Sequence, residues 1–360
     1  MKSARSPLQV LLERVVTEKV SLSRGDMVFA FECMFNGSES DIAIGSFLTA
    51  LAMKGESDDE ILGTYEAVRK KENKFGPALG PSIDISGTGG EGLKTFNIST
   101  AAAIVAAASG CRVAKHGNRS MSGPCGSADF LEAVGFDLLS SKETLLRSLD
   151  KVGVTFLFAP NFHPLMKNIS NARRALTIRT ILNIVGPLCN PCVNLSGHLI
   201  GVSKESLLTQ ISNVMKKSNL KRFMVAYSQD GFDELTNTCD SNVIYSNQGQ
   251  LSTLLIHPQE YDLALSQKDD LTISSKEECI RLTMEAIYGY APVKILDAIV
   301  LNAAAALLIG NLVDKLSEGI ELARSNIKNG NARAILRELI RECGDEEKLL
   351  RVERTLRKRH

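Results

Sequence analysis

The chain has 360 residues, which is enough for one large domain and a smaller one. Its formal net charge is +1, so the protein as a whole has no charge excess that would attract nucleic acid or a membrane surface. A hydrophobic fraction of 44% and a charged fraction of 23% are typical of a globular protein, and the lack of Trp argues against a surface that stacks nucleic-acid bases.

The eight cysteines are scattered, and the first residues do not resemble a signal peptide. We therefore expect reduced thiols and a cytoplasmic location. Cys189 and Cys192 form a C-x-x-C pair, but no second pair with suitable spacing suggests a metal site. The longest apolar run, 298–310, is too short to cross a bilayer, so we expect a buried helix there and no membrane partner.

The first 75 residues have the pattern of four short helices. Leu8, Leu11 and Val15 recur at helical spacing, and Ser57 precedes a segment whose acidic start and basic end complement a helix dipole. Four short helices bury little apolar surface by themselves. This part therefore needs a partner surface, either from the rest of the chain or from a second subunit.

The most informative stretch begins with a short predicted strand, 83–85. Four glycines follow within six residues, and glycines so dense allow positive φ angles and let backbone N–H groups approach a ligand. An Ala-rich helix over 101–109 comes next, with Ser99 or Thr100 as its N-cap and Gly110 as its stop. A second strand, 112–116, completes a unit whose helix N-terminus favours phosphate or pyrophosphate.

Short polar and basic side chains gather around this unit. They lie at the helix start, at the end of the second strand and in the glycine-rich loop that follows: Asn97, Ser99, Thr100, Lys115, His116, Asn118, Arg119, Ser120 and Ser127. The spacing matches neither a Walker A loop nor a dinucleotide fingerprint. The alternative is a tight turn in an ordinary α/β domain.

Two further segments carry candidate ligands. Arg173 and Arg174 lie beside an apolar helix in 171–191, where they form either a solvated helix face or a basic pocket. His163 is either a pocket residue or a hydrogen-bonding surface group. Asp233 and Glu234 follow a predicted strand, 223–228, and such a carboxylate pair is either solvated or binds magnesium.

The C-terminal third is mainly helical in pattern. Segments 276–288, 295–308 and 316–330 are predicted core helices. The stretch 332–360 is also helical and ends in a basic tail, which we interpret as a solvated helix end rather than a nucleic-acid contact.

The strings GTGGEG, NIST, KHGNR and GSAD occur in this order and spacing, and together they resemble the anthranilate phosphoribosyltransferase family. The segment 171–191 and the DGFDEL segment are similar to two further motifs of that family. The resemblance extends from the N-terminal helices to about Asn331. It implies transfer of the 5-phosphoribosyl group from phosphoribosyl pyrophosphate to anthranilate, in tryptophan biosynthesis.

The resemblance also implies a set of site residues. Those for phosphoribosyl pyrophosphate are Gly87, Gly90, Glu91, Thr95, Asn97, Ile98, Ser99, Thr100, Lys115 and Ser127. Those for anthranilate are Gly87, His116, Asn118 and Arg173. Those for magnesium (Mg2+) are Ser99, Asp233 and Glu234. No acid, base or nucleophile is assigned.

The fold implied by the resemblance is α/β, of the nucleoside phosphorylase and phosphoribosyltransferase kind. A small all-helical domain would span 1–76, with about 170–190 packing back onto it, and would form a homodimer interface. A large α/β domain would span 80–360, with a central, mostly parallel sheet surrounded by helices. The active site would lie between the two domains.

Several positions depart from the family pattern. Glu91 stands where Asp is usual, Pro124 and Cys125 where Lys and Ser are usual, Leu165 where Ala is usual and Thr177 where Gly is usual. These changes leave room for another aromatic acceptor.

Two other functions remain as alternatives. A pyrimidine nucleoside phosphorylase has a similar glycine loop, but it carries K-x-S-G-R where this chain has KHGNR. A nucleic-acid-binding relative would lack the glycine and NIST motifs, which are intact here, and would be strongly basic.

Overall fold

The computed structural model describes residues 5–76, 80–89, 92–120 and 123–358. The chain divides into two compact units. The helical unit comprises residues 1–74 and 160–191, and the sheet unit comprises 75–159 and 192–360. The chain therefore leaves the helical unit after residue 74 and re-enters it for a second segment of helices.

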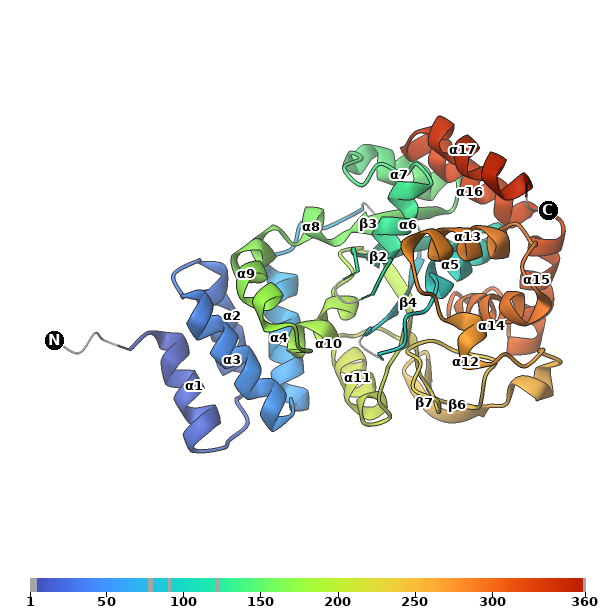
Figure 1. The fold of residues 1–360 in the computed structure, drawn as a ribbon. Coiled ribbons are helices and arrows are strands. Elements are labelled where there is room, and N and C mark those ends of the chain that lie inside the picture. Colours follow the sequence, from blue (N-terminus) through green and yellow to red (C-terminus); the bar gives the residue numbers. More distant parts are fainter. Residues whose placement is uncertain (1–4, 77–79, 90–91, 121–122, 359–360) are drawn as a thin grey trace. The chain divides into compact units, whose positions relative to one another are not determined.

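The helical unit contains the four predicted N-terminal helices and a second group from the later segment (Figure 1). Their bounds are α1 Pro7–Thr17, α2 Arg24–Phe35, α3 Asp41–Lys54, α4 Asp58–Lys70, α8 Ala159–Phe162, α9 Lys167–Leu176 and α10 Ile181–Leu188, with a 3-10 turn at Pro164–Met166. Ser6, Ser23 and Ser57 cap α1, α2 and α4 through capping boxes. Gly63 lets α4 approach α2, because a Cβ there would overlap the Arg24 carbonyl oxygen.

His163 is buried in the helical unit, so the alternative of a surface group is wrong. Its Nε2 donates a hydrogen bond to the Cys189 carbonyl oxygen at 2.9 Å. Burial lowers the pKa of His163 to about 4, and the ring is therefore neutral near pH 7.

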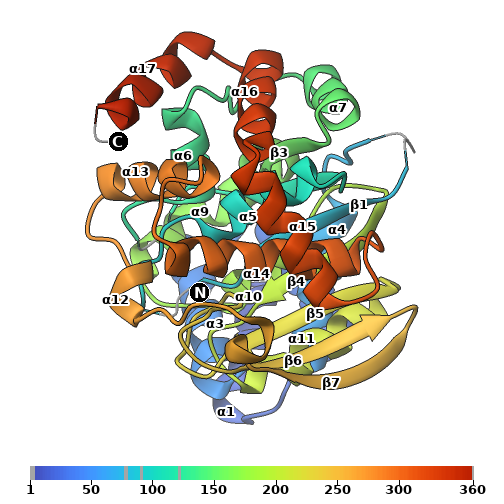
Figure 2. The same ribbon diagram turned by 90° about the vertical axis from the view of Figure 1, so that its right-hand side faces the viewer.

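The sheet unit is built on seven strands in the order β3-β2-β1-β4-β5-β6-β7 (Figure 2). Their bounds are β1 Ser82–Gly87, β2 Val113–Gly117, β3 Val154–Phe158, β4 Leu195–Gly201, β5 Arg222–Ser228, β6 Ser241–Asn247 and β7 Gln250–Ile256. The first five in spatial order are parallel, and β6 and β7 are antiparallel. The prediction of a mostly parallel central sheet is confirmed.

Helices surround this sheet. Their bounds are α5 Ile98–Ala108, α6 Ser127–Ala133, α7 Lys142–Lys151, α11 Ser206–Lys217, α12 Lys268–Leu271, α13 Lys276–Ile287, α14 Val293–Ile309, α15 Leu316–Lys328, α16 Asn331–Cys343 and α17 Glu346–Arg357, with a 3-10 turn at Pro258–Tyr261. The Ala-rich helices α5 and α14 are almost entirely buried and contact each other and the sheet. Small side chains allow this close packing, and α14 contains the predicted buried run. Within the described residues, the helices are too short or too polar to cross a membrane.

The strand order reverses at β1, which lies between β2 and β4. The chain moves from β1 to β2 and β3 on one side, and β4 and β5 extend the sheet on the other side. Gly87 and Gly201 are paired at the carboxyl ends of β1 and β4. In open α/β sheets, ligands bind beside the carboxyl ends of strands at such a reversal.

One prediction about local structure is wrong, and two elements were not predicted. Helix α5 begins at Ile98 with Asn97 as its N-cap residue, so neither Ser99 nor Thr100 caps it. The Asn97 side chain makes no cap hydrogen bond because it donates to cysteine sulfurs instead. The structure also contains β4 and α11, for which no element was predicted.

The C-terminal stretch forms two helices and is only partly the solvated end that we expected. Helix α16 stops before Gly344, and α17 then buries Leu349, Glu353 and Leu356. The Glu353 carboxylate accepts hydrogen bonds from Arg337 at 2.7 and 2.6 Å and from the Tyr288 hydroxyl. A buried charge therefore fastens α17 to α16 and to the end of α13.

We predict that Glu353→Ala lowers the free energy of unfolding by about 2 kcal/mol, because two donors lose a charged acceptor. Urea unfolding followed by circular dichroism measures the change. Glu321→Ala is the control, since this exposed glutamate on α15 should change stability by less than about 0.5 kcal/mol. Equal effects in the two variants would contradict the anchoring role of Glu353.

Candidate functional site

Asp233 lies against the carboxyl ends of two parallel strands. A Cβ atom on Gly87 would overlap the Asp233 carboxylate, and one on Gly201 would overlap its main-chain carbonyl. The carboxylate accepts a hydrogen bond from the Gly89 N–H at 2.6 Å, and Gly89 adopts φ +64°, which favours glycine. Glycine at these three positions therefore allows Asp233 to lie beside β1 and β4, where the strand order reverses.

The two carboxylates of the DGFDEL segment are buried rather than solvated. Asp233 is 6% exposed and Glu234 is 8% exposed. Buried carboxylates usually pair with cations or donors, so both belong to an organised polar centre rather than to a surface loop.

Lys115 connects the strand ends to the start of α5. It lies on β2, is buried, and its ammonium donates to the Ile85 carbonyl at 2.5 Å and to the Ser99 hydroxyl at 3.1 Å. Burial lowers the pKa of Lys115, whereas the nearby charges of Asp84 and Glu234 raise it. The ammonium is thus close to both a helix N-terminus and an acidic group.

Sequence reasoning missed a polar pair beneath the glycine loop. Asp84 on β1 is paired in register with His198 on β4, and the His198 Nε2 lies 3.4 Å from an Asp84 carboxylate oxygen and 2.9 Å from the Ser86 hydroxyl. The other Asp84 oxygen accepts from the His116 N–H at 3.1 Å. Burial lowers the pKa of His198, and Asp84 partly offsets that effect. No local motif signals this pairing, because it depends on strand register.

The first turn of α5 presents backbone N–H groups that have no partner within the helix. Asn97 precedes the helix, and its own N–H donates to the Thr283 hydroxyl of α13 at 3.3 Å. The Ile98 side chain is buried in the core, and its backbone N–H already donates to the Phe96 carbonyl at 2.7 Å. Thr100 is also buried, and its hydroxyl has no hydrogen-bond partner within the described residues. We call the candidate anion-binding surface at this helix start and at the glycine loop the cradle. At the helix start, it consists mainly of backbone groups and the Ser99 side chain.

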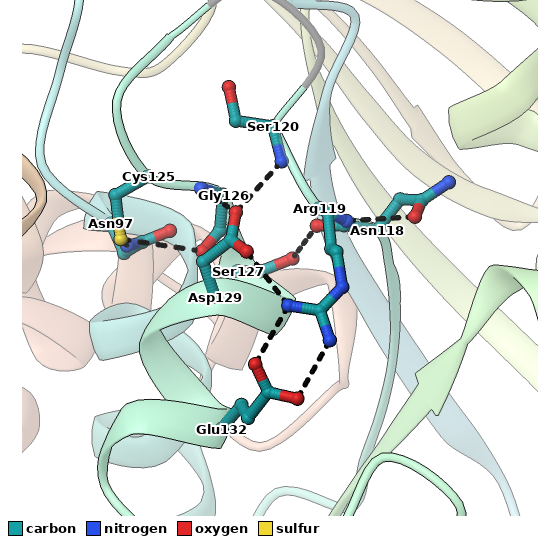
Figure 3. A network of polar contacts seen from close by, with 9 residues as sticks. All are labelled: Asn97, Asn118, Arg119, Ser120, Cys125, Gly126, Ser127, Asp129 and Glu132. Carbon is teal, nitrogen blue, oxygen red and sulfur yellow. Dashed lines mark hydrogen bonds and ion pairs between the residues drawn. The ribbon is translucent and has the colours of Figure 1, made fainter.

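Asp129 holds the loop between β2 and α6 in place (Figure 3). One of its oxygens accepts from the Ser120 N–H at 3.0 Å and the Gly126 N–H at 2.9 Å, and the other accepts from Arg119 at 3.0 Å. Arg119 also pairs with Glu132 at 2.7 and 2.8 Å. Both ends of the loop are therefore fixed to the first helical turn of α6.

This loop brings two predicted site residues together. The Ser127 hydroxyl donates to the Asn118 carbonyl at 3.3 Å, and the Asn118 side chain accepts from the next N–H along the chain at 2.8 Å (Figure 3). Thr95 forms an isolated bridge with Thr272. The predicted site residues Gly90 and Glu91 lie outside the described residues.

Arg173 lies on α9 of the helical unit, next to the exposed Arg174. It is partly buried, and burial lowers its pKa, with no carboxylate of the described residues contributing to the shift. The helix ends at Thr177, whose φ of +51° is a left-handed conformation that costs a non-glycine residue roughly 1 kcal/mol.

The donor set for magnesium fits the chemistry of the ion. Its three members each supply oxygen and all belong to the sheet unit: Ser99, Asp233 and Glu234. Lys115 donates a hydrogen bond to Ser99 and interacts electrostatically with Glu234. Within the described residues, no three His, Cys, Asp or Glu side chains gather as a complete metal cage. Magnesium commonly takes one or two carboxylates and completes its shell with water and substrate phosphate.

Two family models match the chain. The α/β domain of a glycosyl transferase family matches residues 79–333, and the helical bundle domain of the same family matches residues 9–71.

Curated relatives match nearly the full length. The anthranilate phosphoribosyltransferase of Acetivibrio thermocellus is 40% identical over 333 residues, which covers 92% of this chain and 96% of the relative. That of Alkaliphilus metalliredigens is 38% identical over 334 residues, which covers 93% and 98%.

Solved structures have the same fold. The anthranilate phosphoribosyltransferase of Thermus thermophilus superposes with a TM-score of 0.84 at 30% identity and covers 94% of this chain and 99% of that one. The enzyme of Saccharomyces cerevisiae, in complex with PRPP and Mg, has a TM-score of 0.86 at 24% identity and covers 94% and 98%.

We predict that Asp129→Asn speeds hydrogen exchange at the Ser120 and Gly126 amides by about tenfold, because a neutral side chain is a weaker acceptor for both N–H groups. Glu132→Gln is a matched control, since Glu132 pairs with Arg119 without contacting the loop backbone. Exchange rates at single amides distinguish the two variants. Unchanged rates in Asp129→Asn would show that the loop does not depend on Asp129.

Proposed function

We propose that this chain, which belongs to the anthranilate phosphoribosyltransferase family, converts anthranilate and phosphoribosyl pyrophosphate into N-(5-phosphoribosyl)anthranilate and pyrophosphate in tryptophan biosynthesis. The observation that carries this proposal is that 92% of the chain is related to these enzymes at 40% identity, and the glycine-lined ends of β1 and β4 support it. Pyrophosphate suits the cradle because helix N-termini and glycine loops bind anions.

Phosphoribosyl pyrophosphate is bound in the sheet unit. The backbone of Gly87 and of the first turn of α5 donates N–H groups to phosphate oxygens, and the Lys115 ammonium adds a positive charge. The residues that we assign to this substrate are Gly87, Gly90, Glu91, Thr95, Asn97, Ile98, Ser99, Thr100, Lys115 and Ser127.

Magnesium is held by Ser99, Asp233 and Glu234 together with the pyrophosphate of the substrate. The bound ion would neutralise negative charge on the leaving group. The protein's own contribution is the position of the carboxylates, which the glycines of β1 and β4 make possible.

Anthranilate is a small aromatic acid, and we assign its recognition to Gly87, His116, Asn118 and Arg173. The guanidinium of Arg173 suits the acceptor carboxylate, since it can donate two parallel hydrogen bonds. Its partial burial, and a pKa shift to which no carboxylate of the described residues contributes, support this role.

The reaction breaks the bond between ribose C1 and the pyrophosphate oxygen and forms a bond from C1 to the anthranilate nitrogen. The amine is neutral when it attacks and loses its proton after C–N bond formation. Catalysis therefore consists of positioning the amine and stabilising charge, so no strong base is required. Lys115 and the α5 N-terminus stabilise the pyrophosphate that leaves.

We also propose that the protein is cytoplasmic and a homodimer. All eight cysteines are free thiols, which supports a reducing compartment. A mainly apolar groove of the helical unit runs along α1, α3 and α9, and Ile42 and Met53 are exposed there by 82% and 84%. A second copy of the same surface would remove these side chains from water.

We predict that Arg173→Ala raises the KM for anthranilate about 10- to 100-fold, because loss of hydrogen bonds to a charged group costs about 1.5–3 kcal/mol. Turnover is followed by the loss of anthranilate fluorescence in the presence of phosphoribosyl pyrophosphate and magnesium. Arg174→Ala, which removes the exposed neighbour, should leave the KM near that of the parent protein.

Each result of this assay has a clear meaning. An unchanged KM in Arg173→Ala would exclude Arg173 from the acceptor site. Binding of phosphoribosyl pyrophosphate without turnover would exclude anthranilate and favour another aromatic acceptor, which the departures at Pro124 and Cys125 allow. Neither binding nor turnover by folded protein would refute the transferase function.

We predict that Ile42→Asp combined with Met53→Asp converts the dimer into monomers, because two charges would have to be buried at the interface. Sedimentation equilibrium measures the molecular mass in solution. Leu139→Asp is the control, since Leu139 is 77% exposed on the sheet unit. A monomeric parent protein, or a double variant that stays dimeric, would contradict this interface.

A further inference from the structure

Two cysteines from distant parts of the chain contact the same side-chain amide. Cys125 lies in the loop before α6, and Cys279 lies in the first turn of α13. The Asn97 Nδ2 is 3.7 Å from the Cys125 sulfur and 3.0 Å from the Cys279 sulfur (Figure 3 shows Asn97 with Cys125). All three residues belong to the sheet unit, so this cluster does not depend on how the two units are placed.

The two thiols, which contact the same Asn97 amide, also shift each other's pKa. A hydrogen bond from the Cys279 thiol lowers the pKa of Cys125, and the Asn97 amide lowers it further. The same hydrogen bond raises the pKa of Cys279, as does burial. Thiolate is the reactive form of cysteine, so Cys125 is the member that ionises more readily, and Cys279, whose sulfur contacts the same Asn97 amide, would react with it second.

We propose that Cys125 and Cys279 are a reversible oxidation site. A peroxide would convert the two thiols into a disulfide, and this disulfide would prevent phosphoribosyl pyrophosphate from binding in the cradle. The disulfide itself is independent of the proposed function, but its effect on turnover rests on that function. Intracellular disulfides of this kind are usually transient and redox-sensing.

The chemistry balances with hydrogen peroxide as the oxidant. The Cys125 thiolate attacks one peroxide oxygen, the O–O bond breaks, and the departing hydroxide takes a proton to give water. Cys125 is then a sulfenic acid. The Cys279 sulfur attacks the Cys125 sulfur, the S–O bond breaks, and the hydroxyl leaves as water with the Cys279 proton. Two thiols are thus oxidised while one peroxide is reduced to two waters.

A bond between these sulfurs would act on the cradle from both sides. Asn97 precedes α5 and donates to both sulfurs, so its amide would have to reorient when they join. Cys125 is followed by Gly126 and Ser127, so a shift of Cys125 would strain the 2.9 Å hydrogen bond between Gly126 and Asp129 and move the backbone that leads to Ser127. Asn97 and Ser127 are both assigned to phosphoribosyl pyrophosphate.

Other cysteines are less suited to this chemistry. Burial raises the pKa of Cys111 to about 12. Burial is also the main reason that the pKa of Cys343 is raised to about 11. Cys239 is only partly buried and provides a control for general oxidation of accessible thiols.

The test treats purified full-length protein with hydrogen peroxide and maps disulfides by peptide mass spectrometry without reduction. The same samples are assayed for turnover before and after addition of dithiothreitol. We expect a peptide pair that joins Cys125 to Cys279, at least a tenfold loss of turnover and recovery with dithiothreitol. Cys125→Ser and Cys279→Ser should keep the turnover of the reduced parent and resist peroxide, whereas Cys239→Ser should respond as the parent does.

The possible failures can be told apart. Absence of the joined peptide in oxidised parent protein would overturn the disulfide, whatever happens to turnover. Calorimetry measures the binding of phosphoribosyl pyrophosphate to the oxidised protein. If the joined peptide is present and binding is unchanged, the disulfide does not block the cradle. Reduced parent protein without any transferase turnover would refute the proposed function, while the mass-spectrometric result would still decide the disulfide. If one serine variant does not fold, Cys279→Ala provides the same test.

Discussion

The structure of the site depends on the close approach of Asp233 to the ends of two parallel strands. Gly87 and Gly201 leave space for this residue, and Gly89 donates a hydrogen bond to its carboxylate. Any side chain at Gly87 or Gly201 would meet Asp233 atoms, so the carboxylate, the glycine loop and the strand reversal are geometrically coupled. A buried acid at this point is costly unless donors or cations satisfy it, which explains the position of the loop backbone.

The other parts of the site are fixed by similar side-chain to backbone contacts. Asp129 holds the ends of the loop after β2, and Lys115 ties β1 to the start of α5. These contacts come from helices and strands rather than from loop residues alone. Under the proposed function, these contacts would hold the described part of the cradle in place before a substrate arrives, and such preorganisation reduces the entropic cost of binding and positions charge for reaction.

Local rules in the sequence predicted much of this arrangement, because glycine density, an Ala-rich helix and short polar residues each have strong local preferences. They failed where a distant partner decides the outcome. Asp84 and His198 are neighbours only because of the register of β1 with β4. The sequence of β4 mixes polar and apolar residues, so its pattern did not predict a strand. Helix α5 starts earlier than predicted, and its Asn97 side chain does not cap it because cysteines on other elements accept from this side chain. The burial of Asp233 likewise depends on glycines far away in the chain.

The most direct test of the central claim is a calorimetric titration of phosphoribosyl pyrophosphate into the parent protein and into Asp233→Asn, with and without magnesium. The amide in this variant keeps an acceptor for the Gly89 N–H but removes the charge. The account predicts tight binding by the parent only when magnesium is present, and a large loss of this magnesium dependence in the variant. Identical affinity and identical magnesium dependence in the two proteins would contradict it.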